Sequence, residues 1–562
     1  MATSLSPDIP LRDPARVMRL SRLGSMHQCR LSFMRVLTRR MAQEGWQFAR
    51  PVFNIDDKGV GHAVYSAQGP ERTYSLVVFA HDLPPEMRSD RVIATAWDAT
   101  FTLFDGIPSE ADIESLSQNV PYQEAGRVNE KSLSVSRANR SVRLWEHFLE
   151  ALSRGEQPDT DKIEAVGYLM RTTAVYGSGK LGASDYDAIS DRDELRVPFQ
   201  VEMLSVFLTR AFVRDLVNHM ARARGGDKAV EMSPEIAGSL GIGNSTGLGL
   251  GPFIVNHPLL FNNWIETRET AIQRVRAVET ATADEISAFR QVFARSQALV
   301  ANWRSEHPVQ IDKLAALRTD ITRLQDHLSG DALDGAQPWD ALVRWSETAL
   351  SEEGQEFIAS LILEPYGALV DDLAPSLADV DSEAFRIDGR MPISKVRALI
   401  EASFGWALDV DWSARENCAR AWYVSEEKLE PRVGERFEEP IAPYETPLAP
   451  ARDAAAAHTA LKDWTDTKPI AAFLLRHPEH RHTIRRAQIS ATAPYSEIRD
   501  NTISAEMFPV DFLRVKLAFF GATHFDPRSD RWVRISMYGN APYPEDLSPE
   551  NADYWVYPEG LS

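Results

Sequence analysis

The chain has 562 residues, of which 44% are apolar and 25% charged, a composition typical of a globular protein of about two to four domains. Its formal net charge of −20 argues against a nucleic-acid partner, because phosphate binding requires a basic surface, and against an anionic membrane surface. The two cysteines lie far apart in the sequence, which favours a reducing compartment. The sequence has no apolar run of about 18 residues, so no membrane span is expected. We therefore expect a soluble cytoplasmic protein.

The first 130 residues predict a small α+β unit. Apolar residues at helical spacing over 13–45 predict one or two helices. Three β-type runs follow at 46–55, 61–67 and 72–81, and turn-forming residues separate them, which predicts a three-stranded antiparallel meander. A helix over 89–104 is expected to cover one face of this sheet.

Helical spacing dominates the central region, so 131–375 is predicted to be a helical domain. The expected helices are 140–153, 162–175, 197–222 and a long stretch over 258–329 that is broken near Thr282 and at His307-Pro308. A near-heptad spacing within that stretch predicts a helical hairpin or a homo-oligomer surface, and it is formed by Ile311, Leu314, Leu317, Ile321 and Leu324.

Residues 376–562 are expected to form a second α+β unit. After a proline-rich loop, its elements are predicted as a helix over 463–477, a strand over 483–490, a helix over 510–520 and a strand over 531–538. The predicted fold is therefore mainly α, with small α+β units at both ends, an antiparallel sheet at the N-terminus and a central helical domain.

A glycine-rich segment at 241–252 is the strongest functional signal, with five glycines in twelve positions. It precedes His257-Pro258, a pattern typical of a helix start, and a glycine-rich loop that leads into a helix presents free N–H groups to an anion. We predict that Asn244, Ser245, Thr246 and Gly247 bind an anionic substrate. The alternative is a close-packed loop without a ligand. The segment matches neither a phosphate-binding Gly-Lys-Ser/Thr loop nor a dinucleotide fingerprint.

A second segment, Tyr176-Gly177-Ser178-Gly179-Lys180, precedes Asp185 and Asp187. It resembles the Gly-Ser and Asp-x-Asp pattern of nucleotidyltransferases, in which paired aspartates hold Mg²⁺. The alternative is a helix that ends at Gly177, followed by a polar loop. Tyr176 and Lys180 are candidates for anion binding or proton transfer in either case.

Two further sites are weighed against structural roles. His480 and His482 would point the same way on a strand and could ligate a metal, although a solvated basic strand is the alternative. Arg499 could clamp a substrate carboxylate, or could form an ion pair at a domain junction.

The favoured function is an enzyme that acts on a small anionic metabolite, a carboxylate or a phosphate, with Lys180, His257 and Tyr176 as acid–base candidates. No cofactor is assigned. A scaffold or regulatory subunit that uses the helical hairpin is the alternative, and a metal-dependent nucleotidyltransferase is the third. The two glycine-rich segments flank the predicted helix 197–222, which would be about 40 Å long, so we expect them at opposite ends of it unless the helix is broken or a second protomer supplies one of them.

Overall fold

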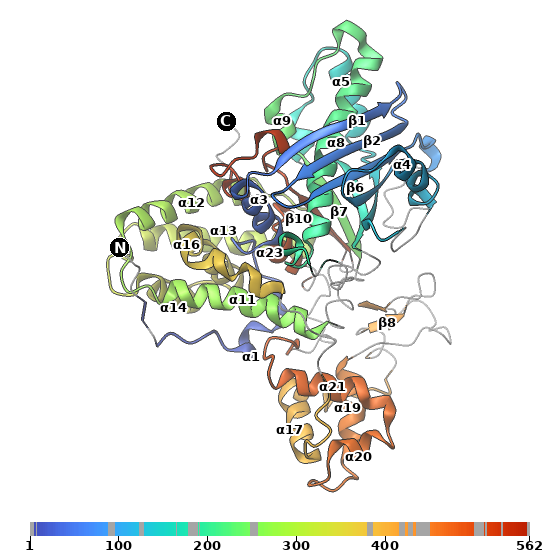
Figure 1. Ribbon diagram of the computed structural model, residues 1–562. Coiled ribbons are helices and arrows are strands. Elements are labelled where there is room, and N and C mark those ends of the chain that lie inside the picture. The colour runs from blue at the N-terminus through green and yellow to red at the C-terminus, as the bar shows by residue number, and fades with distance from the viewer. Residues whose placement is uncertain are drawn as a thin grey trace.

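The computed structural model (Figure 1) describes most of the chain. The described residues are 5–6, 8–87, 96–122, 129–164, 166–177, 189, 191–247, 257–378, 386–414, 417, 422–424, 431–433, 450–499, 511, 514–529 and 532–558.

A nine-stranded sheet is the centre of the described fold. In sheet order its strands are β1 (Gln47–Ile55), β2 (Gly61–Gln68), β3 (Thr73–Ala80), β4 (Ala99–Asp105), β5 (Ser132–Arg140), β6 (Tyr168–Gly177), β7 (Gly241–Gly247), β11 (Trp532–Met537) and β10 (His524–Ser529). Neighbouring strands of this sheet pair antiparallel, except that β6 and β7 run parallel.

This sheet corrects the predicted fold. The antiparallel meander of β1, β2 and β3 is confirmed, but the chain is not mainly α with separate small units at its ends, because the ranges 1–130, 131–375 and 376–562 all contribute strands to one mixed sheet. Residues 99–105 and 168–177 form strands where helices were predicted. Strands buried on both faces lack an apolar–polar alternation, so their short apolar runs resemble buried helices.

The 26-residue helix α8 (Gln200–Gly225) packs along one face of the sheet, across β2 to β7. The helices α3 (Phe33–Gln43) and α5 (Trp145–Ser153) pack beside it. Its buried side chains interlock with those of the strands, as in the edge-to-face contact between Phe101 and Phe212. On the opposite face, α4 (Glu110–Ser117) covers the region of β3 and β4 around Val77 and Phe104.

A helical lobe lies beside the sheet, at the left of Figure 1. It contains α11 (Pro258–Arg276), α12 (Ala283–Asn302), α13 (Pro308–Leu328), α14 (Pro338–Ala349), α15 (Glu352–Leu361) and α16 (Gly367–Val370). The predicted breaks are confirmed, since Thr282 caps α12 through a capping box and Pro308 is the first residue of α13. Four residues of the predicted seam are buried within the chain and Ile311 is exposed.

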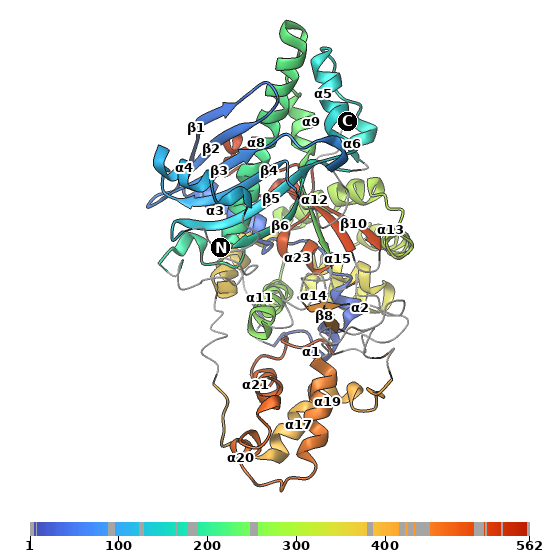
Figure 2. The same cartoon turned by 90° about the vertical axis from the view of Figure 1, so that its right-hand side faces the viewer.

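A small lobe within residues 393–490 lies at the lower end of the molecule in Figures 1 and 2, and it is called the terminal lobe for that position. It has its own apolar core. Its helices are α17 (Ile393–Phe404), α19 (Pro450–Leu461), α20 (Ile470–Leu474) and α21 (Arg481–Ser490). The strand predicted over 483–490 is therefore wrong, because Ile484 and Ala487 bury one face of a helix.

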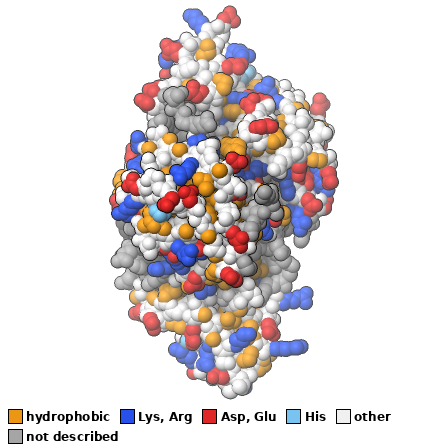
Figure 3. Space-filling model, turned by 90° about the vertical axis from the view of Figure 1, so that its left-hand side faces the viewer, with side chains coloured by type: hydrophobic (Ala, Val, Ile, Leu, Met, Phe, Trp, Pro, Cys, Tyr) orange, Lys and Arg blue, Asp and Glu red, His pale blue; other side chains and the backbone are white. Residues whose placement is uncertain are grey.

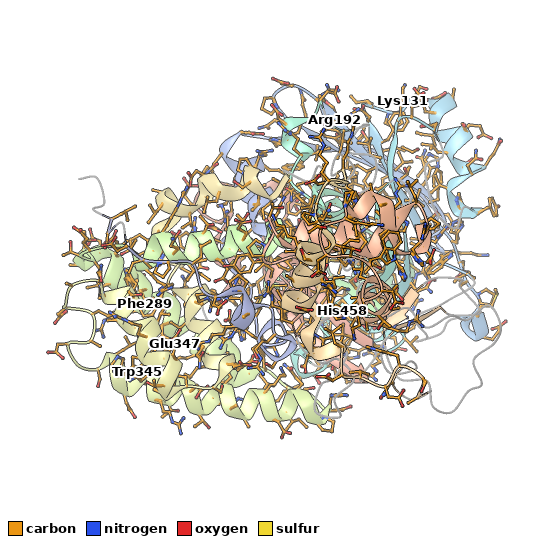
Figure 4. All side chains as sticks on the ribbon, turned by 90° about the horizontal axis from the view of Figure 1, so that it is seen from below. Lys131, Arg192, Phe289, Trp345, Glu347 and His458 are labelled. Carbon is orange, nitrogen blue, oxygen red and sulfur yellow. The ribbon has the colours of Figure 1, made fainter. Side chains whose placement is uncertain are left out.

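The remaining described elements are short. They are α1 (Pro14–Val17), α2 (Leu20–Leu23), α6 (Thr160–Glu164), α9 (Pro234–Ser239), α23 (Val515–Phe520) and the hairpin of β8 (Trp422–Val424) and β9 (Pro431–Val433). None of the helices in the described ranges combines the length and the apolar character of a membrane-spanning segment. Figure 4 shows Phe289 and Trp345 in the helical lobe and His458 in the terminal lobe.

Candidate functional site

The parallel pairing of β6 and β7 brings the two glycine-rich segments to one edge of the sheet. The register joins Tyr168 to Gly241 and Thr172 to Asn244, and the strands then end at Gly177 and Gly247. The expectation that α8 separates the segments is wrong, because α8 belongs to a crossover that returns the chain in the same direction. Lys180, Asp185 and Asp187 lie outside the described residues, as do 248–256.

The segment 241–247 is a strand and not a loop. Its residues pair with β6 on one side and with β11 on the other, so their backbone groups belong to the sheet and do not form an anion-binding loop. Two of its glycines are required for packing. A Cβ atom at Gly241 would lie 2.4 Å from the carbonyl oxygen of Met537, and one at Gly243 would lie 2.6 Å from the ring of Tyr168. The packing alternative therefore holds for these two positions.

Asn244 projects from one face of this strand into a chain of hydrogen bonds. Its Oδ1 accepts from the Lys516 ammonium at 2.8 Å, and its Nδ2 donates to the Thr172 hydroxyl at 3.1 Å. Thr172 donates in turn to the carbonyl of Gly243 at 3.2 Å. Lys516 lies on α23 and is only 2% exposed, and this burial lowers the pKa of its ammonium to about 7. Asn244 was predicted as a site residue, and Lys516 was not.

The opposite face of the same strands carries three buried arginines. Residues paired directly across a sheet share a face, and so do alternate residues of one strand. Asn139 pairs with Arg171, Arg171 with Gly243, and Gly243 with Ser536, which places these side-chain positions on one face. Arg137 lies two residues from Asn139, and Arg534 two residues from Ser536, so both belong to this face.

Two of these arginines flank a row of small residues. Arg171 and Arg534 are 3% and 6% exposed, and their strands β6 and β11 lie on either side of Gly243 and Ser245 of β7. Arg137 is 7% exposed and lies one strand further away on β5, where its guanidinium group stands 5.6 Å from the ring centre of Trp97. Asp526 pairs with Arg534 in the register and adds a carboxylate to the same face. A single arginine within an apolar strand run, as in Val533-Arg534-Ile535, is the sequence signal that could have identified this arrangement.

The other predicted residues are distributed around this edge and beyond it. Tyr176 precedes the last residue of β6, and Ser245 to Gly247 complete β7, with only their backbone described. His257 is the N-cap residue of α11, which confirms the predicted helix start at Pro258.

Arg499 lies at the junction between α21 and the N-terminal segment. Its side chain donates to the carbonyl of Pro494 at 3.2 Å, and its backbone N–H donates to the carbonyl of Met18. The neighbouring Glu497 is buried, and its Oε1 lies 3.1 Å from Nε of Arg486. The described contacts therefore associate Arg499 with this junction and not with Asn244.

The two candidate metal ligands do not lie on a strand. His480 ends a 3₁₀ turn and stacks on Phe473 with the ring centroids 5.8 Å apart, whereas His482 is an exposed residue in the first turn of α21. Residues two apart on a helix do not face each other, so the proposed pair is wrong. Among the described residues, no group of three or more His, Cys, Asp or Glu side chains is placed to hold a metal ion.

Comparison of the chain with protein-family models, curated proteins and solved structures found no match.

Proposed function

We propose that the protein is an enzyme that acts on a small anionic metabolite, a carboxylate or a phosphate, bound at the carboxyl edge of β6 and β7. The observation that carries this proposal is the parallel register of these strands, which brings their last residues, Gly177 and Gly247, to the same end of the sheet. In open sheets with helical crossovers, ligands bind outside the carboxyl ends of parallel strands, where the chain leaves each strand for a loop.

Positive groups on both faces of β7 support an anionic ligand. Arg171 and Arg534 flank β7 on one face, where they outnumber the single carboxylate of Asp526 that pairs with Arg534 in the register, and Lys516 reaches Asn244 from the other face, in a chain whose net charge is −20. A guanidinium group contacts a carboxylate or a phosphate through two parallel hydrogen bonds, and a lysine ammonium contacts it as a compact charge.

Acid–base chemistry at the same edge has several candidate groups. Lys516 has a pKa near 7, so that it exchanges a proton at neutral pH, which is the property expected of a general acid or base. It joins Lys180, His257 and Tyr176, which precede or follow the strand ends in the sequence.

Sulfate binding by the wild-type protein and two arginine variants tests this proposal. Low millimolar sulfate, compared with chloride at equal ionic strength, is expected to raise the thermal unfolding temperature, because a ligand at about 100 times its Kd stabilises the folded state by about 2.7 kcal/mol. Arg534→Met should weaken sulfate binding at least about tenfold, since it removes a charged hydrogen-bond donor. Arg344→Met is the control, because that side chain is 65% exposed and pairs with Asp340 on α14.

An equal sulfate response in all three proteins would contradict the proposed site, because it would show only the general effect of a stabilising salt. If Arg534→Met alone loses the response, a panel of phosphorylated and carboxylated metabolites then identifies the substrate class by the size of its stabilisation.

A further inference from the structure

Lys516 is a buried cation whose described hydrogen-bond partner is neutral. Its ammonium donates to the amide oxygen of Asn244 at 2.8 Å, and within the described part of the chain no carboxylate is recorded within ion-pairing distance of it. Burying a charge without a counter-charge is costly, and in such a place the group tends to lose its proton instead. A bound anion would supply the missing negative charge.

The groups around Lys516 do not supply that charge. The neighbouring strand β6 presents the Thr172 hydroxyl, and β11 presents the apolar side chain of Ile535 opposite Asn244. On its own helix, the ring of Phe520 lies 6.0 Å from the ammonium. These neighbours are neutral, which is why burial alone accounts for the lowered pKa of Lys516.

The nearest ionised groups along the chain belong to a separate cluster. Arg514, two residues before Lys516, contacts the carboxylate of Glu353 on α15. The same carboxylate lies 2.9 Å from Nε2 of His27, and Lys313 of α13 pairs with Asp511 at 3.0 Å. These carboxylates are therefore engaged with other cations.

We propose that an anionic group of the ligand pairs with Lys516, in a contact on the face of β7 opposite Arg171 and Arg534, and that the ligand binds together with one proton. This inference rests on the proposed function, and it names a residue that pairs with the anion. The neutral amine of Lys516 accepts a proton from solvent as the anion arrives, and the resulting ammonium forms the ion pair with the anion. The amide oxygen of Asn244 continues to accept a hydrogen bond from one N–H of this ammonium. The proton taken up then lies on an acid beside the bound substrate.

Calorimetric titration with sulfate measures this proton directly, because sulfate does not itself titrate near neutral pH. At pH 8, titrations in two chloride-balanced buffers of different ionisation enthalpy should show uptake of about one proton per bound anion. At pH 6 the uptake should fall to near zero, because the amine already carries its proton there.

Two substitutions separate this role from a structural one. Asn244→Asp keeps the size of the side chain but places a permanent carboxylate beside Lys516, so the lysine should stay protonated, the sulfate should bind more weakly and the proton uptake should disappear. Lys516→Arg should bind sulfate without proton uptake, because a guanidinium does not titrate. Lys395→Arg, an exposed position in the terminal lobe, is the control and should keep the wild-type uptake.

A proton number near zero for the wild-type protein at pH 8, or the same number in Asn244→Asp as in the wild type, would overturn the inference while the proposed anion site stands. Failure of the wild-type protein to bind sulfate at all would overturn the proposed function as well. The wild-type comparison of pH 6 with pH 8 needs no variant to fold.

Discussion

Glu497 is a buried carboxyl group at the junction between α21 and the N-terminal segment. It is 4% exposed, and Arg486 and Arg499 both lie close enough to favour its charged form. Burial nevertheless outweighs the two arginines and raises the pKa of Glu497 to about 7. The junction between the terminal lobe and the body of the molecule is therefore sensitive to pH.

The folded protein should lose stability as the pH rises through the window set by Glu497. Between pH 4.5 and 7 the folded state keeps a proton that the unfolded state has released, so the free energy of unfolding should fall by about 1.4 kcal/mol per pH unit, or about 3 kcal/mol in total. Glu497→Gln should remove this dependence, so that the free energy of unfolding of the variant, compared with that of the wild-type protein, is more favourable at pH 8 than at pH 5. Urea unfolding at both pH values measures the effect.

The control for this prediction is Glu235→Gln, which changes an exposed glutamate in the first turn of α9. The prediction is wrong if Glu497→Gln changes the free energy of unfolding equally at pH 5 and pH 8.

Single residues of the candidate site differ in how far they could be predicted. Asn244 was predicted because small polar residues among glycines mark an unusual backbone, and the structure places its amide in contact with Lys516. Lys516 was not predicted, because one lysine in the run Val515–Phe520 is normally a side chain whose charged end reaches water. Its burial depends on α23 packing against β11 and against α3, and α3 is distant in sequence.

At the scale of elements, β7 shows why glycine density misled the prediction. Glycine commonly marks turns, but it also occurs in strands where another group approaches the backbone closely. Gly241 and Gly243 are of this second kind, since Met537 and Tyr168 fill the space of a side chain. The helix-like runs at 99–104 and 168–175 were similarly ambiguous, because the strands that pair with them, β3 and β5, lie outside the short stretch of sequence over which spacing is judged.

Gly243→Ala should destabilise the protein by about 1 to 3 kcal/mol, because the added methyl group meets the Tyr168 ring inside a packed sheet. The matched control is Gly335→Ala, where no atom lies within 4 Å of the added Cβ and the change should be close to neutral or slightly stabilising. Chemical denaturation of both variants measures the difference. Equal effects would show that Gly243 is not kept for packing.

At the scale of the whole molecule, the N-terminal segment joins parts that are distant in sequence. Arg12 pairs with Glu269 of α11 and Glu356 of α15, each at 2.7 Å. Arg35 of α3 pairs with Glu364 at 2.7 Å and with Asp553 near the C-terminus at 2.8 Å. Helices within 13–45 were predicted from spacing, but partners more than 250 residues away leave no local pattern.

The overall charge also acts at this scale. Figure 3 shows acidic and basic side chains interspersed over one face of the molecule, so that the coloured side chains on that side form no extended basic surface. In the proposed function, binding of an anion by a chain of net charge −20 therefore depends on the buried cations beside β7, which are Arg171, Arg534 and Lys516.

An anomalous difference map from crystals soaked in selenate, a sulfate analogue with a strong anomalous signal, tests the central claim most directly. The account predicts a peak at the carboxyl edge of β6 and β7, within hydrogen-bonding distance of the Lys516 ammonium or the Arg534 guanidinium. A fully occupied selenate elsewhere, with no density at this edge, would contradict it.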